Sequence, residues 1–259
     1  MTSTTGSSSL VAERAATLRA LHRPGDPLVL VNAWDVASAL TVQAAGGQAI
    51  ATSSAAIAAS LGLPDADTMD PDIAFGAVER IAAAVTVPVT ADLEAGYGLP
   101  ADELVERLVA AGGVGCNIED TDHRTPGSLV AADVMAARVA ALRDAAARQG
   151  VPIVLNARVD VLARGVHDDR AAGIADVLHR GRLYREAGAD CIYPIGLAGP
   201  DEAARVVAEV GGWVNGNLGP NVTVAQMAAA GVSRISFGPT FQRRAMADLA
   251  ERAAELLGR

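Results

Sequence analysis

The chain has 259 residues and no lysine, so all 21 of its basic residues are arginines. Enzymes that form a Schiff base with their substrate, or that hold pyridoxal phosphate, need a lysine amine. A phosphate-binding P-loop also needs a lysine. The missing lysine therefore excludes three catalytic devices, whatever its cause.

Several other features are scarce. There are only two cysteines, Cys116 and Cys191; both lie in apolar runs, which favours buried thiols and a cytoplasmic location. No apolar run approaches the roughly 20 residues that span a bilayer. Residues 1–9 are rich in Ser and Thr without the pattern of a secretion signal, so we expect a disordered tail there. The net charge of −9 argues against nucleic acid or an anionic membrane as partner.

Apolar residues make up 51% of the chain and form short runs that alternate with longer amphipathic segments. The runs predict strands at 27–32, 48–52, 87–92, 114–119, 153–158, 191–194, 213–217 and 233–237. The segments predict helices at 35–45, 71–84, 101–111, 131–149, 169–187, 200–210, 223–229 and 240–257. Strands too apolar to face water predict a single (β/α)8 barrel over residues 10–259, with a doubly wound open sheet as the alternative. An extra helix at 10–22 either plugs the bottom of the barrel or packs on its outside.

The segment 91–98, Ala-Asp-Leu-Glu-Ala-Gly-Tyr-Gly, begins at the end of the predicted strand 87–92. Asp92 and Glu94 therefore emerge together, and their i, i+2 spacing points both carboxylates to one side of an extended chain. Two such carboxylates repel each other unless a hard cation lies between them. The motif predicts a metal site or, alternatively, a solvated loop with two unrelated acids.

Other charged residues follow the remaining strands, and the carboxyl ends of the strands form the active site of such barrels. Asp65, Glu119 and Asp120 add carboxylates. This favours Mg²⁺, with Mn²⁺ as an alternative, held by one direct ligand and by others through water. Arg158 is the basic residue at a strand end. It either grips a substrate carboxylate with two hydrogen bonds or forms an ion pair with Asp160 or a neighbouring Glu.

A metal ion beside a carboxylate-binding arginine predicts a small 2-oxo acid or dicarboxylate as substrate. The carboxylate and keto oxygens of a 2-oxo acid chelate Mg²⁺, which stabilises the enolate that develops when a bond at C3 breaks. Asn215, at the end of the strand predicted at 213–217, is a further candidate for substrate binding.

These motifs resemble the isocitrate lyase and phosphoenolpyruvate mutase superfamily. The matching segments are Asn-Ala-Trp-Asp at 32–35, Thr-Ser-Ser at 52–54 with Ser-Leu-Gly-Leu-Pro-Asp at 60–65, the acidic motif at 92–98, Asn-Ile-Glu-Asp at 117–120 and Ala-Arg-Val-Asp at 157–160. The resemblance implies a (β/α)8 barrel whose last helix swaps between subunits of a homo-oligomer, a dimer or tetramer. It also implies Mg²⁺-dependent cleavage or formation of a C–C or P–C bond next to a 2-oxo acid.

The resemblance also implies roles for individual residues. Asp92 matches the direct metal ligand, and Asp65, Glu94 and Glu119 match its water-mediated partners. Arg158 matches the arginine that binds the substrate carboxylate. The segment that holds the oxo-acid end of the substrate is matched by Trp34, Ser53 and Ser54.

The loop after the fourth strand departs from the characterised subgroups. Lyases that cut isocitrate or methylisocitrate carry a Lys-Lys-Cys-Gly-His-like segment there, whereas residues 121–128 read Thr-Asp-His-Arg-Thr-Pro-Gly-Ser. The mutases place a lysine in this loop and a histidine beyond the sixth strand, and this chain has neither. His123 supplies a proton or binds an anion from this loop, or it is a solvated side chain.

The sequence therefore predicts a Mg²⁺-dependent lyase. It would cleave a C–C bond of a small 2-oxo acid, or of its aldol-type precursor, through an enolate. P–C bond chemistry, as in phosphonopyruvate hydrolase or phosphoenolpyruvate mutase, is the alternative among enzymes. A non-catalytic binding scaffold on the same fold is the alternative of another class, because both known loop chemistries are missing.

Overall fold

A computed structural model describes residues 4–258 and contains one parallel sheet of nine strands. The strands are β1 (Leu28–Leu30), β2 (Asn32–Ala33), β3 (Ile50–Thr52), β4 (Val89–Asp92), β5 (Gly115–Glu119), β6 (Val154–Val159), β7 (Cys191–Pro194), β8 (Trp213–Gly216) and β9 (Arg234–Ser236). Each overlaps a strand predicted from the sequence, and the first predicted strand is divided into β1 and β2.

The sheet closes on itself through this divided strand. The strand order is β1-β9-β8-β7-β6-β5-β4-β3-β2, so β1 and β2 lie at the two ends of the order. β1 pairs with β9 and β2 pairs with β3, while only Val31 separates β1 from β2 in the chain. The segment 28–33 therefore joins both edges, and the sheet forms a nearly closed barrel. The open-sheet alternative is wrong.

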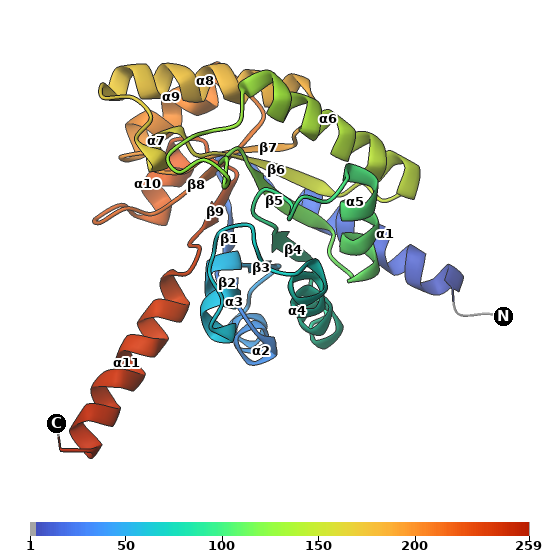
Figure 1. Ribbon diagram of the computed structural model, residues 1–259, viewed down its shortest axis with the longest axis vertical. Coiled ribbons are helices and arrows are strands. Elements are labelled where there is room, and N and C mark those ends of the chain that lie inside the picture. The colour runs from blue at the N-terminus through green and yellow to red at the C-terminus, as the bar shows by residue number, and fades with distance from the viewer. Residues whose placement is uncertain (1–3, 259) are drawn as a thin grey trace.

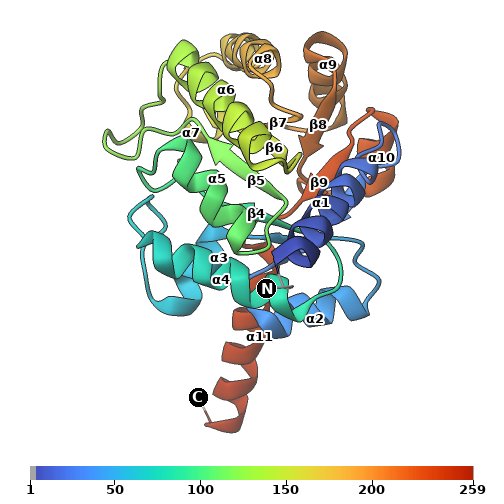
Figure 2. The same cartoon turned by 90° about the vertical axis from the view of Figure 1, so that its right-hand side faces the viewer.

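Helices surround the strands (Figures 1 and 2). They are α1 (Thr4–Ala20), α2 (Val36–Ala44), α3 (Ser54–Leu61), α4 (Pro71–Ala84), α5 (Ala101–Ala110), α6 (Ala132–Gln149), α7 (Val161–Arg164), α8 (Arg170–Glu186), α9 (Pro200–Val210), α10 (Val224–Ala229) and α11 (Thr240–Leu256). Two short helices, α3 and α7, were not predicted. Helix α1 begins earlier than the expected residue 10, and residues 1–3 of the expected tail lie outside the described residues.

Helix α1 crosses the end of the barrel at which the strands begin. Arg14 donates to the carbonyl of Val85, which precedes β4, and Arg19 donates to Asp190, which precedes β7. Leu18 is fully buried and lies against Gly115, the first residue of β5. The N-terminal helix is therefore the plug of the barrel bottom, and the opposite end remains available for the site.

The last helix behaves differently from the others. Figure 1 shows α11 projecting away from the barrel. Gln242 is the buried residue of this helix, whereas Met246 and Leu249 are 45% and 58% exposed. The single chain therefore leaves most of α11 without a covering surface.

The core is apolar and the thiols belong to it. Cys116 on β5 and Cys191 on β7 are free and fully buried, as expected, and burial raises the pKa of each thiol to about 12. Within residues 4–258, none of the helices combines the length and the hydrophobicity that a membrane span requires.

Candidate active site

The carboxyl ends of the strands, here called the mouth of the barrel, carry the acidic motif. Asp92 is the last residue of β4, and the chain then turns through left-handed backbone conformations at Glu94 (φ 50°) and Tyr97 (φ 53°). Such conformations are uncommon for non-glycine residues and persist where surrounding contacts hold them. The turn is a fixed structure and not the solvated loop of the alternative interpretation, because the Glu94 side chain is buried.

The start of α3 and the neighbouring strand β5 orient the Asp92 carboxylate. The backbone N–H and the hydroxyl of Ser54 donate to its Oδ2 at 3.2 and 3.1 Å. Asn117 on β5 donates its amide to Oδ1 at 3.4 Å. Ser53 does not contact Asp92 in this way, since its hydroxyl accepts from Ala56 and caps α3. The predicted Ser53–Ser54 segment thus meets the acidic motif at the start of α3.

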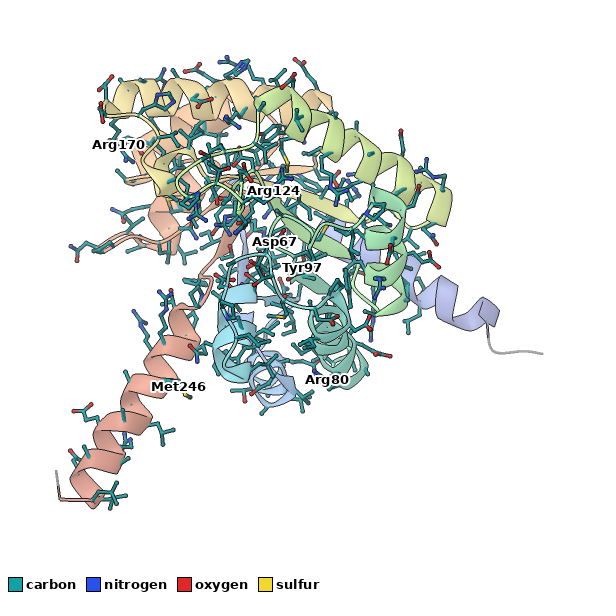
Figure 3. All side chains as sticks on the ribbon, in the orientation of Figure 1. Asp67, Arg80, Tyr97, Arg124, Arg170 and Met246 are labelled. Carbon is teal, nitrogen blue, oxygen red and sulfur yellow. The ribbon has the colours of Figure 1, made fainter. Side chains whose placement is uncertain are left out.

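Asp67 is a site residue that the sequence reasoning missed. Its carboxylate accepts hydrogen bonds from the backbone N–H groups of Ala95 and Tyr97 at 3.1 and 2.8 Å. Its own N–H donates to Oε2 of Glu94. Figure 3 labels Asp67 and Tyr97 close together near the centre of the molecule. The sequence could have indicated Asp67 as a candidate, because Asp65 and Asp67 have the same i, i+2 spacing as Asp92 and Glu94.

Arg158 on β6 lies between two buried carboxylates. Its Nη1 is 2.6 Å from Oε2 of Glu119, and its Nε and Nη2 donate to the two oxygens of Asp160 at 2.6 and 2.8 Å. Both ion pairs of the alternative interpretation are thus present. A guanidinium has five N–H donors, so two remain after these three contacts. Arg158 is 18% exposed at its side chain and can still bind a substrate carboxylate.

His123 contacts this same group. Its Nε2 lies 2.7 Å from Oε1 of Glu119, and its side chain is only 13% exposed. The bond to Glu119 raises the pKa of His123. The histidine is therefore held at the mouth, in a form that keeps its proton to higher pH than a free imidazole.

Burial dominates the electrostatics of the acids. It raises the pKa of Glu94 to about 8, with further contributions from Asp65 and Glu119. Burial likewise raises the pKa of Asp65, and repulsion by the Asp92 carboxylate raises it further. Burial also raises the pKa of Glu119, although the hydrogen bond from His123 and the charge of Arg158 act to lower it. Burial alone would lower the pKa of Arg158, but Glu119 and Asp160 raise it overall. The mouth thus holds more acidic groups than its one arginine can neutralise, and burial favours the protonated form of several of them.

The oxygen atoms at the mouth show whether it suits a divalent cation. Oε1 of Glu94 is buried without a hydrogen-bond partner, and the acids that surround it offer only oxygen ligands, which Mg²⁺ and Mn²⁺ prefer. Within the described chain, no three or more Asp, Glu, His or Cys side chains form a ready set of direct ligands. The oxygen donors of the mouth and the partnerless oxygen of Glu94 suit a hard divalent cation such as Mg²⁺, which commonly keeps several of its waters.

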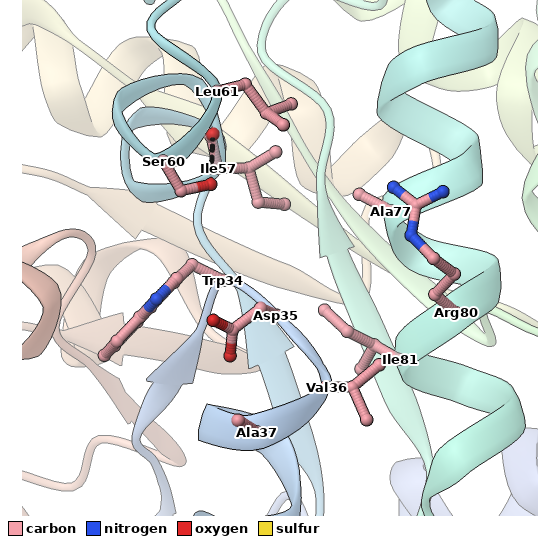
Figure 4. Close-up of a pocket in the computed structure, with 10 residues that line it drawn as sticks. All are labelled: Trp34, Asp35, Val36, Ala37, Ile57, Ser60, Leu61, Ala77, Arg80 and Ile81. Carbon is pink, nitrogen blue, oxygen red and sulfur yellow. Dashed lines mark hydrogen bonds between the residues drawn. The ribbon is translucent and has the colours of Figure 1, made fainter.

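Two predicted residues lie elsewhere. Trp34 lines a separate cavity of about 390 Å³ between α2, α3 and α4, with Ile57, Leu61 and Arg80 (Figure 4). Asn215 is fully buried inside the barrel, where its amide donates to Ser236 and its carbonyl accepts from Asn156. Trp34 packs against the same apolar cluster as Tyr97 of the acidic motif, and the roles of Trp34 and Asn215 in substrate binding stay predictions.

A parallel barrel with a carboxylate-rich, arginine-containing mouth defines a class of strand-end active sites. Residues 18–257 match the family model described as phosphoenolpyruvate phosphomutase. The chain therefore belongs to the phosphoenolpyruvate mutase and isocitrate lyase superfamily. It is 33% identical over 220 residues to the uncharacterized protein Rv1998c of Mycobacterium tuberculosis, covering 84% of this chain and 80% of that protein. It is 31% identical to the 2-methylisocitrate lyase of Escherichia coli over 67% of this chain and 62% of the enzyme.

Solved structures agree with this membership. A Burkholderia cenocepacia protein with a provisional phosphonomutase name is 40% identical, with a TM-score of 0.85 over 93% of this chain and 99% of that one. A 2,3-dimethylmalate lyase is 28% identical, with a TM-score of 0.83 and coverages of 94% of this chain and 87% of that one. A phosphonopyruvate hydrolase bound to oxalate and Mg²⁺ is 28% identical, with a TM-score of 0.81 and coverages of 94% of this chain and 86% of that one. The superfamily thus contains lyases, mutases and hydrolases, and its members bind small acids.

Proposed function

We propose that this protein is a Mg²⁺-dependent lyase that cleaves a C–C bond of a small 2-oxo acid or of its aldol-type precursor. The main support for this proposal is the arrangement of acids and arginine at the mouth of the barrel. Asp92 is oriented by Ser54 and Asn117, and the buried oxygen of Glu94 has no partner. Beside them, Arg158 keeps two donors for a carboxylate. A binding scaffold has no need of this costly combination.

In this proposal Asp92 is the direct Mg²⁺ ligand, and Asp65, Glu94 and Glu119 hold the waters of the ion. When bound, Mg²⁺ polarises the oxygens of the oxo acid and disperses the negative charge of an enolate. Arg158 binds the substrate carboxylate, while Glu119 and Asp160 fix its guanidinium. His123 is the proton donor at the mouth, because its bond to Glu119 raises the pKa of its imidazole and so favours the protonated form. The substrate thus lies between the start of α3 and the end of β6.

The test measures pyruvate, glyoxylate and phosphate released from a panel of candidate substrates. The panel contains oxaloacetate, other 3-substituted 2-oxo acids, methylisocitrate and phosphonopyruvate, each with Mg²⁺ and with EDTA. We expect release that depends on Mg²⁺ and yields no phosphate. Phosphate release would instead identify P–C chemistry, and no turnover of any compound would favour a binding scaffold.

The Asp92→Asn variant tests the role of the metal ligand. Loss of the charged ligand should lower kcat/KM by about 100-fold or more and weaken Mg²⁺ binding in calorimetry. Asp35→Asn is the matched control, because Asp35 also follows a strand but caps α2, and Asn caps a helix equally well. Unchanged Mg²⁺ binding and activity in Asp92→Asn would contradict the assignment.

A further inference from the structure

A second cavity, of about 360 Å³, opens beside the acids of the mouth. It lies between the start of α5, the first turns of α6 and the loop 121–130. Glu119 and His123 line this cavity and also contact each other at the mouth. A ligand bound at the mouth can therefore extend into this cavity without leaving the surface of the protein.

One wall of the cavity is apolar. Leu99, Val130, Val134 and Met135 contribute to its lining, and Val134 is 57% exposed. An alkyl chain that covers these side chains would remove apolar surface from water, which is favourable by about 25 cal/mol per Å². The wall therefore suits a carbon chain.

The cationic side chains of this cavity differ in whether a carboxylate already pairs with them. Arg124 is 92% exposed at its side chain and pairs with Asp122, and His123 is held by Glu119. Arg138, on α6, is half-buried and donates to the backbone carbonyl of Leu99 at 2.7 Å. Among residues 10–258, whose side chains are described, no carboxylate lies within 4.0 Å of the Arg138 guanidinium.

A half-buried guanidinium without an anion is costly, and burial lowers the pKa of Arg138 accordingly. An anion that entered the cavity would restore the missing partner through charge-assisted hydrogen bonds. Asp67 is the nearby carboxylate that acts on Arg138 at longer range, and its Oδ1 accepts from the N–H groups of Ala95 and Tyr97.

We propose that this cavity binds the substituent at C3 of the substrate, with its carbon chain on the Leu99–Val134–Met135 wall and a terminal carboxylate on Arg138. The inference rests on the proposed function and narrows it. The substrate class becomes acids that carry a second, chain-borne carboxylate at C3, and Arg138 becomes the residue that selects them.

The test compares two ligands that differ only at C3. 2-Methylisocitrate carries CH₂–COO⁻ there, whereas 2,3-dimethylmalate carries CH₃. Dissociation constants are measured by calorimetry with Mg²⁺ present, so that turnover is not needed. We expect the protein to bind 2-methylisocitrate at least about tenfold more tightly, and Arg138→Met to reduce this ratio to about one. Arg138→Lys should retain part of the preference, because it keeps the charge.

The ratio separates substrate binding from a structural role. Arg138 also packs against the acidic loop, since a Cβ on Gly96 would lie 2.8 Å from its Nη2. If Arg138 only supported that loop, Arg138→Met would weaken both ligands equally and leave the ratio unchanged, which would overturn the inference. A ratio near one in the unaltered protein, or no binding of either ligand, would also overturn it.

Two controls complete the design. Arg14→Met removes a guanidinium that likewise donates to backbone carbonyls, those of Ala82 and Val85, but at the bottom of the barrel. Arg124→Met removes the exposed cation of the same cavity. Both variants should keep the ligand preference. The proposed lyase activity is tested separately, by turnover of the substrate panel with Mg²⁺. A protein that shows the expected ratio of dissociation constants but no Mg²⁺-dependent turnover would contradict the proposed function and not the binding preference.

Discussion

At the scale of single residues, His22 shows how strongly burial controls protonation in this fold. Its ring stacks on Trp213 with centroids 4.7 Å apart, and its Nδ1–H donates to the carbonyl of Leu18 at 2.8 Å. Burial, followed by the charge of Arg234, lowers the pKa of His22 from 6.5 to about 4. The folded protein therefore holds this histidine neutral at pH values where an unfolded chain would protonate it.

The consequence is a loss of stability in acid. Between pH 6.5 and about 4 the unfolded state binds the proton and the folded state does not, so the free energy of unfolding falls as the pH falls. From this one group the loss is about 2 kcal/mol by pH 5. Urea unfolding at pH 7.5 and pH 5 should therefore show a smaller acid-induced loss in His22→Gln than in the unaltered protein.

His179→Gln is the control for that measurement, because His179 is exposed on α8. Its acid-induced loss should match that of the unaltered protein. The variants must be compared with one another because buried acids also respond to pH. The pKa of Glu94, for example, is raised in the folded state, so this group increases the free energy of unfolding as the pH falls. If His22→Gln lost as much stability as the control, the buried neutral histidine would not be the cause.

At the scale of elements, the fit of α1 into the barrel bottom depends on a glycine. A Cβ added to Gly115 would lie 2.9 Å from Leu18 and 3.0 Å from both the Thr90 hydroxyl and the Val154 carbonyl. The carbonyl is backbone and cannot move without disturbing β6. We therefore expect Gly115→Ala to lower the free energy of unfolding by about 1–3 kcal/mol, measured by urea denaturation.

Gly76→Ala provides the matched comparison. Gly76 is inside α4, and an added Cβ would meet only the end of the Arg80 side chain, at 3.5 Å. Replacing a helical glycine without a clash should stabilise by roughly 0.5–1 kcal/mol. Gly115→Ala as stable as the unaltered protein would show that α1 does not pack as tightly as the structure indicates.

The elements also mark what the sequence could reveal. Strands of a parallel barrel are buried on both faces, so their apolar runs could be found directly. Helix α3 was missed because Ser54–Leu61 is short and rich in alanine, which leaves no periodic apolar stripe. Its signals were the Ser53 cap and the left-handed Gly62 that ends it, at φ 68°.

The sequence could predict which residues form the candidate site, but it could not predict which of them contact one another. Asp92, Glu94 and Glu119 could be placed at the mouth because strand ends of a barrel converge. Whether Arg158 pairs with Glu119 or Asp160 depends on distances between β5 and β6, and the structure has both pairs. Asp67 acts through a left-handed backbone conformation at φ 55°, which side-chain spacing alone does not specify.

At the scale of the whole molecule, α11 carries an apolar stripe that the single chain leaves uncovered. Met246, Leu249 and Leu256 are 45%, 58% and 89% exposed, and their spacing puts them on one side of a helix. Charged residues occupy the opposite side: Arg244, Asp248, Glu251 and Glu255. A stripe of this kind on a projecting helix indicates a protein surface that covers it, and we propose that a second copy of the chain does so.

We therefore expect light scattering after gel filtration to give a dimer or tetramer. Each apolar side chain that the assembly buries contributes roughly 1.5–3 kcal/mol. Met246→Glu combined with Leu249→Glu should therefore weaken association by about 100-fold or more. The variant should elute at lower mass with its helical circular dichroism retained. Glu251→Arg, on the charged side of the same helix, should leave the mass unchanged. A monomeric unaltered protein at micromolar concentration, or an unchanged mass in the double variant, would mean that α11 projects into solvent for another reason.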